Sequence, residues 1–505
     1  MLVRVERGTY EITATGIAAL RTGPEVFTVR WLIDNGYDAP TALAAGPGPD
    51  EGRRRVAWRQ RSDAGVAAGS TPVELAQRPL AVRVGGWRLP FFYGWVIAGV
   101  GFVVNMLFGA MMFHSFGTYV VLLRAEFGWS LTSFSLAFAL MRVESGLLGP
   151  IEGWAIDRVG PRAIMRVGVI LFGVGLILLS QIQSLLTFYL VFLLMALGSA
   201  LGSFLPISVA IVNWFDRRRA TALAIVSLGF SAGGLIQPLV VWGLETLGWR
   251  PVSVIAGLIT LIVGLPLTQL VRHRPEDHGY HPDGVSAEEA RAHAPRADAS
   301  FTTRQALRTQ AFWMLSLGQS ASMLVFGAVS VHFVAHMHDG LGFSLGTAAG
   351  AITVMTVAMV VGQLVFGGFL GDRMNKKLVI CVAMWGNTLA MVLLALGTTL
   401  WIILVFAIVN GLAMGARGPL MQALRADYFG RRNFGTIMGF SSLVMMFGIV
   451  SGPLLAGLSY DVLGEYRPAF LLLAAMSTVG SVFFMFARKP AAHATPVPPA
   501  TPAAV

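Results

Sequence analysis

The sequence predicts an all-α polytopic membrane protein, in which twelve transmembrane helices form two pseudo-symmetric six-helix lobes and both termini are cytoplasmic. The 505 residues are 55% hydrophobic and only 12% charged, whereas a soluble domain carries about 25% charged residues. Apolar runs of about 20 residues, long enough to cross a bilayer, recur along the chain. A short polar motif occurs twice, each time between two such runs.

The repeated motif reads GWAIDRVGPR at residues 153–162 and GFLGDRMNKK at residues 368–377. Glycine, aspartate, arginine and the final cation keep their relative positions, with a shift of 215 residues from Gly153 to Gly368. Asn375 replaces the second glycine, and asparagine also tolerates left-handed backbone. Because each copy separates two apolar runs, we infer an internal duplication.

Residues 1–88 do not share this pattern. They are rich in Arg, Gly, Pro and Ala, and they contain no apolar h-region of a signal peptide. We expect either a disordered cytoplasmic extension or translated sequence upstream of the natural start. The other predicted segments are an N-terminal six-helix lobe at 89–271, a cytoplasmic connector at 272–310, a C-terminal six-helix lobe at 311–488 and a disordered, Pro/Ala-rich tail at 489–505.

Twelve apolar runs give the expected helices. Those of the first lobe are 93–121, 131–156, 163–182, 186–214, 220–244 and 251–271, and those of the second are 311–336, 344–370, 378–397, 399–426, 434–460 and 468–487. Cations gather in the loops after helices 2, 4, 6, 8 and 10, as in Arg217-Arg218-Arg219, whereas 181–184 and 398–399 have none. By the positive-inside rule, the arginine-rich loops and both termini are cytoplasmic.

The duplication extends beyond the motif. Gly198-x-x-x-Gly202 matches Gly411-x-x-x-Gly415, and the sequence WRP at 249–251 matches YRP at 466–468. The two halves therefore have the same orientation. Parallel repeats of this kind are related by an axis along the membrane normal, and the substrate site lies at their interface near the midplane.

Six plus six helices with the G-x-x-x-D-R-x-G-x-R motif after helices 2 and 8 resemble the major facilitator superfamily. The resemblance covers residues 90–490. Three further stretches, ESGLLGP at 144–150, RPED at 274–277 and ADYFGRR at 426–432, are similar to the bacterial monocarboxylate and oxalate/formate porter-like branch. The resemblance implies a secondary transporter that works by alternating access.

The resemblance also implies that the repeated motif latches the lobes together. Asp157 can lie against a helix N-terminus of the other lobe, where the positive end of the dipole favours an anion. Arg158 and Arg162 can bridge to that contact or to anionic headgroups, or the motif can be a topology anchor without a conformational role. The expected gating residues are Gly153, Asp157, Arg158, Gly160, Arg162, Gly368, Asp372 and Arg373.

Solute binding is expected where the two halves differ. Arg142 and Glu144 in helix 2 correspond to Val357 and Met359, and Arg417 in helix 10 corresponds to Phe204. A charge at membrane depth normally faces a partner or a wet cavity, and guanidinium offers a fork that matches a carboxylate. An internal Arg417–Glu144 pair is the alternative. The expected solute-binding residues are Arg417, Arg142, Tyr119, Asn105, Gln319 and Asn410.

Proton coupling is expected from groups that can titrate within the helices. His332 and His336 are one turn apart in helix 7, and His114 lies near the outer end of helix 1. Glu144 is the fourth coupling candidate. Each histidine can instead be a hydrogen-bonded structural residue, and no carboxylate or cysteine joins the histidine pair to form a metal site.

The remaining composition excludes several classes of protein. The net charge of +11 does not indicate nucleic-acid binding, because the cations cluster in alternate loops beside apolar runs. One cysteine, Cys381, forbids an intramolecular disulfide. No Walker loop, nucleophile elbow or H-E-x-x-H motif is present, so we expect neither an enzyme nor a cofactor.

We therefore expect a multi-pass transporter of the bacterial inner membrane. It would move a small carboxylate-bearing solute, either with protons or by exchange. The alternatives are a drug or sugar porter of the same superfamily and, from another class, a non-transporting membrane sensor. Membrane lipids are the other expected partners.

Overall fold

The computed structural model describes residues 2–6, 9–12, 82–84, 87–89, 92–285, 289 and 300–490. Residues 1–77 and 78–505 are separate compact units. In the first, β1 (Leu2–Glu6) pairs antiparallel with β2 (Thr9–Ile12); in the second, β3 (Val82–Val84) pairs antiparallel with β4 (Trp87–Leu89). The disorder predicted for 1–88 and for the tail otherwise lies outside the described residues, so it stays a prediction.

The predicted all-α membrane fold is confirmed, because the described residues form 12 helical spans that are long and apolar enough to cross a bilayer. The N-terminal lobe contains α4 (Gly94–Phe108), η2 (Gly109–His114), α5 (Phe116–Phe127), α6 (Leu131–Val159), α7 (Pro161–Leu179), α8 (Leu185–Gly202), α9 (Phe204–Trp214), α10 (Arg219–Leu247) and α11 (Trp249–Gln269). The C-terminal lobe contains α14 (Gln310–Ala335), η5 (His336–Gly340), α15 (Leu345–Val361), η6 (Gly362–Phe369), α16 (Lys376–Leu396), α17 (Leu400–Phe429), α18 (Phe434–Leu463) and α19 (Arg467–Phe486). Between the lobes lie the short helices η3 (Glu276–His278), η4 (Pro282–Gly284) and α13 (Thr303–Leu307).

Side-chain caps define where several helices begin. The hydroxyl of Ser184 accepts a hydrogen bond from the Thr187 N–H, and Thr187 bonds back to the Ser184 N–H, which forms a capping box at the start of α8. Asn375 caps α16 in the second motif copy. In the first copy, Gly160 turns the chain between α6 and α7 with φ at 96°, a conformation that favours glycine.

The spans contain irregularities that hydropathy did not predict. The first, seventh and eighth spans include the π-helical segments η2, η5 and η6. The fourth span breaks at Ser203, between α8 and α9. Pro206, three residues further along the chain, explains this break. Proline has no N–H to donate, and its ring clashes with the preceding turn of a continuous helix.

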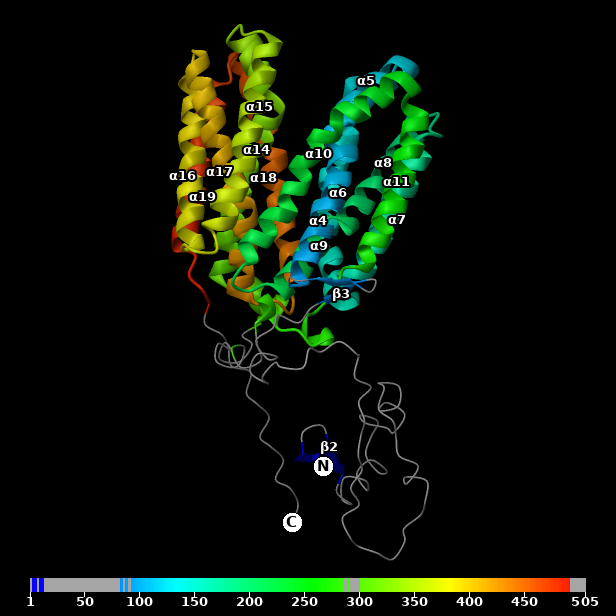
Figure 1. Ribbon diagram of the computed structural model, residues 1–505. Helices are drawn as coiled ribbons and strands as arrows, with labels where there is room; N and C mark the ends of the chain where they lie inside the picture. Colours follow the sequence, from blue (N-terminus) through cyan, green and yellow to red (C-terminus); the bar gives the residue numbers. More distant parts are fainter. Residues whose placement is uncertain are drawn as a thin grey trace, which may run out of the picture. The chain divides into compact units, whose positions relative to one another are not determined.

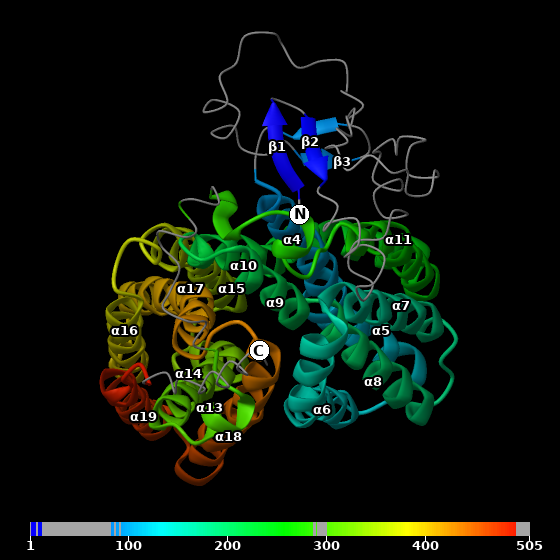
Figure 2. The ribbon, with the colours of Figure 1, turned by 90° about the horizontal axis from the view of Figure 1, so that it is seen from below.

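The two lobes meet at the end that carries the connector, which we call the connector end (Figure 1). The helices of the lobes diverge toward the opposite end, where α5 and α15 lie (Figure 1). Seen from below, α6 lies beside α18 and α10 beside α17 (Figure 2), and both pairs are in contact.

Glycines permit the α6–α18 contact between the lobes. A Cβ on Gly153 would overlap the carbonyl oxygen of Gly435, and a Cβ on Gly439 would overlap that of Gly149. Small residues let membrane helices approach this closely. The same device operates inside the C-terminal lobe, where a Cβ on Gly452 in α18 would overlap the carbonyl oxygen of Leu324 in α14.

Gly452→Ala is therefore expected to destabilise the protein by about 1–3 kcal/mol, the usual cost of overpacking a tight contact. Gly99→Ala is the matched control, because Gly99 lies in α4 with nothing within 4 Å of the added methyl group. Thermal unfolding of the purified chain in detergent should show a lower Tm for Gly452→Ala and an unchanged or slightly higher Tm for Gly99→Ala. Equal Tm values for the two variants would contradict the packing argument.

Candidate solute site and interlobe gate

Asp157 joins the end of α6 to the start of α18 in the other lobe. Its carboxylate accepts hydrogen bonds from the N–H of Gly435 at 2.9 Å and from the N–H of Thr436 at 2.7 Å. The hydroxyl of Thr436 donates a third, also at 2.7 Å. These N–H groups belong to the first turn of α18, where they have no partner within the helix. The carboxylate therefore satisfies exposed donors and faces the positive end of the helix dipole.

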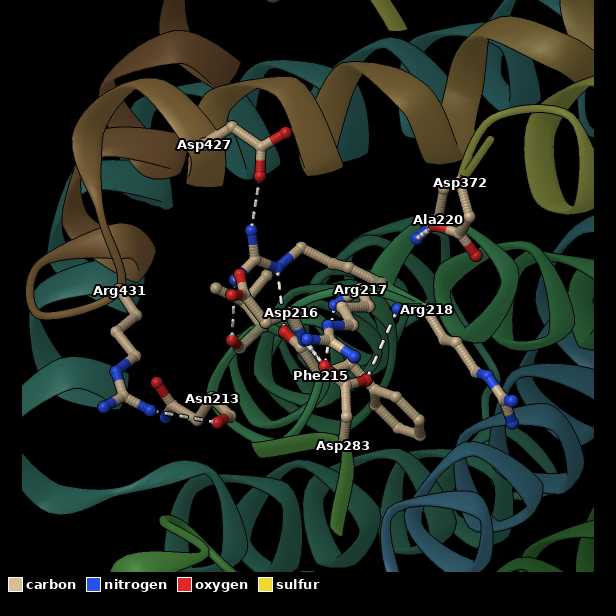
Figure 3. Close-up of polar contacts among 12 residues, drawn as sticks. Asn213, Phe215, Asp216, Arg217, Arg218, Ala220, Asp283, Asp372, Asp427 and Arg431 are labelled. Carbon is tan, nitrogen blue, oxygen red and sulfur yellow. Dashed lines mark hydrogen bonds and ion pairs between the residues drawn. The ribbon is translucent and has the colours of Figure 1, made fainter. Parts of the chain in front are cut away.

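Asp372 forms the corresponding contact in the opposite direction. It follows η6 in the C-terminal lobe, and its carboxylate accepts from the N–H of Ala220 at 2.8 Å and of Thr221 at 3.0 Å, in the first turn of α10 (Figure 3). Each lobe thus supplies one aspartate that caps a helix of the other lobe. We call these two contacts the paired aspartate caps.

An ion-pair network lies between the caps. Arg219, at the start of α10, donates to Asp427 of α17 at 2.6 Å and to Asp216 at 3.1 Å. The second oxygen of Asp427 accepts from Lys376 at 2.8 Å. Figure 3 shows Asp427 above Asp216. Since Arg219 and Asp427 belong to different lobes, this ion pair also joins the lobes at the connector end.

The connector takes part in the same region. Arg431 of the C-terminal lobe pairs with Glu276 of η3 at 2.7 Å and donates to the carbonyl of Asn213 at 3.3 Å. Asp283 of η4 has φ at 59°, and its carboxylate accepts from the N–H groups of residues 216, 217 and 218 (Figure 3). The connector is therefore bound to the loop that precedes α10.

The other expected gating residues have different roles in the geometry. Gly153 forms the α6–α18 crossing, and Gly368 faces α10, where its Cβ position is 3.2 Å from that of Ala224. Gly160 forms the turn described above. The arginines do not contact the caps: Arg158 lies over the ring of Trp154, Arg373 lies over Phe369, and Arg162 donates to Gln269.

Arg142 is the partly exposed cation among the expected solute-binding residues. Its guanidinium lies 5.0 Å from the ring centre of Phe138 and 5.5 Å from that of Phe113. It forms no ion pair with a carboxylate in the described part of the chain. Arg142 precedes Gly146 by one turn, and a Cβ on Gly146 would overlap Met446 of α18. The charge therefore lies one helical turn from a contact between the lobes, on the side away from the connector end.

Arg417 lies inside the C-terminal lobe rather than between the lobes. It is 2% exposed, and its guanidinium contacts the sulfur of Met384 in α16 at 3.9 Å. Gly411 and Gly415 of α17 pack against α15, and this rotation of α17 directs Arg417 toward α16. No Arg417–Glu144 pair is present among the described residues; the contact recorded for Glu144 is a 3.3 Å hydrogen bond from Ser145.

The four uncharged solute-binding candidates are buried within the lobes. Asn105 donates to the carbonyl of Gly101 in its own helix, and the hydroxyl of Tyr119 accepts from Ser253. Gln319 is 7% exposed and Asn410 is 0% exposed. Both amides keep side-chain atoms without a partner among the described residues.

The coupling candidates fall into two groups. His332 contacts the carbonyl of Pro453 at 3.0 Å, and His336 packs edge-on against Tyr466 and Phe470, so both lie within the C-terminal lobe. His114 contacts the carbonyl of Phe230 at 3.1 Å. Its ring also comes within 3.4 Å of the Cβ position of Gly234.

An open hollow of roughly 390 Å³ runs along the second half of α10. Its lining includes Gly234, Gln237 and Glu245. His114 lies against Gly234, one of the residues of this lining. Gln237 and Glu245, the polar residues of this lining, were not among the candidates chosen from the sequence.

Two buried charged residues were not among the candidates chosen from the sequence. Glu152 in α6 is 6% exposed and Arg425 in α17 is 1% exposed. Each has a side-chain atom without a partner among the described residues. Both lie inside the expected helices 131–156 and 399–426, so the cost of burying a charge in a membrane helix could have identified them.

Comparison with known proteins assigns the family. The model of the Major Facilitator Superfamily matches residues 101–367 and 315–504. The chain is 26% identical over 432 residues to monocarboxylate transporter 11 of Mus musculus, covering 81% of this chain and 90% of that protein. It is 28% identical over 256 residues to the membrane sensor protein UhpC of Salmonella typhimurium, covering 49% of this chain and 56% of that protein.

A solved structure agrees in fold. The human organic anion transporter MFSD10 superposes with a TM-score of 0.60 at 15% identity, covering 77% of this chain and 99% of that one. The chain therefore belongs to the major facilitator superfamily. It is a multi-pass secondary transporter of small solutes, and not an enzyme.

Replacing both capping aspartates should release the connector end. Asp157→Asn with Asp372→Asn removes two charges from helix N-termini, and each is worth about 1 kcal/mol or more in a partly buried position. Together they amount to about 2 kcal/mol or more, so conformations with separated connector ends should become about 30-fold more populated or more. The measurement is the distance distribution between spin labels at Arg218→Cys and Arg432→Cys in a Cys381→Ser background.

The matched control is Asp461→Asn, which removes a carboxylate from the opposite end of α18. It should leave the distance distribution unchanged. The latch is contradicted if the double variant keeps the wild-type distribution, or if Asp461→Asn broadens it equally.

Proposed function

We propose that this transporter carries a small organic anion with a carboxylate group, and that Arg142 binds the carboxylate. The observation that carries the proposal is a partly exposed guanidinium at membrane depth, without an ion pair in the described part of the chain and one helical turn from the α6–α18 contact at Gly146. An unpaired charge at that depth normally faces a wet cavity or a ligand. Guanidinium can bind a carboxylate through two parallel hydrogen bonds.

The aromatic rings around Arg142 fit the rest of such a solute. Phe113 and Phe138 flank the guanidinium, and Phe113 also contacts Phe230 of α10 edge-to-face at 4.9 Å. A short hydrocarbon chain could pack on these rings while its carboxylate meets Arg142. Two similar proteins, monocarboxylate transporter 11 and the organic anion transporter MFSD10, have names that refer to organic anions of this kind.

Arg417 is a second cation for the same role. Its burial requires a rearrangement of α16 and α17 before a solute could reach it, so we consider Arg142 the stronger candidate.

We also propose that the protein resides in a bacterial inner membrane with the connector end in the cytoplasm. The arginine-rich loops at that end support this orientation.

Proton coupling through Glu152 is the mechanism we favour. Glu152 lies between Gly149 and Gly153, the two glycines at which α6 crosses α18. The elements packed against α6 bring few charges to Glu152. Helices α8 and α9 contain no charged residue, and Asp461 of α18 and the charges of α5 lie toward the end away from the connector. Arg162 and Arg166 lie in the first turns of α7. A neutral carboxyl is the form that such a site tolerates.

Separation of the lobes would hydrate this crossing. Glu152 would then meet water on the connector side and could release its proton there. Glu144, two turns away in α6, also has an oxygen without a partner among the described residues, so it is a second carrier on the same helix.

Arg142→Ala should abolish saturable uptake of carboxylates into proteoliposomes, because the variant lacks the cation that we propose binds the carboxylate. Arg142→Lys keeps the charge but loses the fork, so KM should rise about tenfold or more. Arg124→Ala is the control, because Arg124 is an exposed cation at the end of α5. Transport of a neutral or cationic compound, with no carboxylate moved, would favour a drug or sugar porter. Binding without uptake would favour a sensor.

Glu152→Gln should remove the stimulation of uptake by an inward proton gradient while leaving exchange of internal for external solute intact. The amide keeps the shape of the carboxyl group but cannot carry a proton. Glu245→Gln, at the last turn of α10, should leave the gradient response unchanged. If Glu152→Gln responds fully to the gradient, another group carries the proton.

A further inference from the structure

Two arginines of α7 converge on one neutral oxygen. Arg162 donates from Nη2 to Oε1 of Gln269 at 2.7 Å, and Arg166 donates to the same oxygen. The arginines are one helical turn apart, and Gln269 is the last residue of α11. An amide oxygen provides an acceptor but no counter-charge, so the two positive charges are not neutralised by this contact.

No carboxylate within the described ranges forms an ion pair with these charges. Neither arginine belongs to an ion pair there, and Nε of Arg166 is buried without a partner. Glu276 of η3 is paired with Arg431. The first turn of α7 has no side-chain cap, so its N–H groups and helix dipole add to the positive potential.

A third guanidinium lies close by. Arg272 is positioned 4.2 Å from the ring centre of Tyr93, and both Arg272 and Arg162 act electrostatically on Tyr93 and on His278. Burial lowers the pKa of His273, and burial together with the charges of Arg272 and Arg162 lowers the pKa of His278, where Asp277 opposes the effect. These imidazoles are therefore mainly neutral at pH 7, and the positive charge comes from the arginines.

Apolar side chains lead away from this cluster along both helices. On α7, Val167 and Ile170 are 47% and 44% exposed; on α11, Ile262 and Val263 are 69% and 38% exposed. The two helices pack side by side (Figure 2). In a membrane these exposed surfaces meet acyl chains, and the arginines lie at the end of the surface, where headgroups begin.

We propose that the cluster of Arg162, Arg166 and Arg272 binds the phosphate of an anionic phospholipid, whose acyl chains lie along α7 and α11. The arginines offer several donors to phosphate oxygens, and Gln269 then becomes a fixed donor through its amide nitrogen. Basic pockets between transmembrane helices bind lipid headgroups in this manner. The continuous apolar surface distinguishes a lipid from a free phosphate ion.

The site also has a structural consequence. Arg162 ends the motif that contains Asp157. A headgroup bound there therefore fixes the start of α7 close to one of the paired aspartate caps. The lipid would act as a permanent part of the N-terminal lobe, independent of which solute is carried.

The test is a titration of the delipidated full-length protein in detergent with phosphatidylglycerol, and separately with phosphatidylcholine, read by native mass spectrometry. One saturable phosphatidylglycerol per chain is expected, with little phosphatidylcholine binding. Arg166→Gln should weaken binding about fivefold, the effect of losing one basic residue near an anionic group. Arg432→Gln, which removes an exposed arginine from the other lobe, should leave the affinity unchanged.

Three results would overturn the proposal. Equal binding of phosphatidylcholine would show that charge does not select the lipid. Equal weakening by Arg432→Gln would show a diffuse electrostatic effect rather than a site. Displacement of the lipid by millimolar inorganic phosphate would assign the cluster to a soluble anion.

Discussion

The contact of an aspartate with the first turn of a helix in the opposite lobe is the interaction on which the observed arrangement depends. It occurs twice, as Asp157 on α18 and Asp372 on α10, and in each case the bonded N–H groups are those of the second and third helical residues. A carboxylate in this position replaces water at donors that the helix cannot satisfy. The connector end closes because each lobe supplies a carboxylate for unpaired N–H groups at a helix start of the other lobe.

The two contacts are related by the duplication, but the ion pairs around them are not. Arg219 and Asp427 form the charged contact between the lobes, whereas their counterparts in the repeat are the neutral Asn433 and Asn213. Asn433 and Asn213 instead donate to backbone carbonyls of the chain that leads into or out of the connector. At each of these two repeated positions, one lobe thus contacts the connector and the other supplies a partner of the interlobe salt bridge.

The fold could be predicted from the sequence because apolar length and loop charge act locally. Twelve spans, their order and the repeated motif all follow from such features, and the structure contains them. The break at Ser203 and the π-helical segments could not be predicted, because hydropathy does not record how a helix accommodates proline or its neighbours. Residues 1–88 lie largely outside the described ranges.

The candidate site was less predictable. Arg142 and Arg417 are equally unusual in the sequence, yet one lies beside the diverging lobes and the other lies against Met384. Their difference comes from the rotation of each helix about its axis, which glycine contacts with neighbouring helices determine. Glu152 was missed because the sequence does not show that α6 crosses α18 at its flanking glycines.

We propose that a carboxylate bound at Arg142 also draws the diverging ends of the lobes together, as the rocking of two repeats around a central site requires. The most direct measurement is the distance between spin labels at Leu247→Cys and Val462→Cys, in a Cys381→Ser background, with and without a carboxylate that the protein transports. These positions lie at the ends of α10 and α18 away from the connector and are 54% and 76% exposed. Our account predicts a shorter distance with the solute in the otherwise wild-type chain and no change in Arg142→Ala. An equal shortening in Arg142→Ala would contradict it.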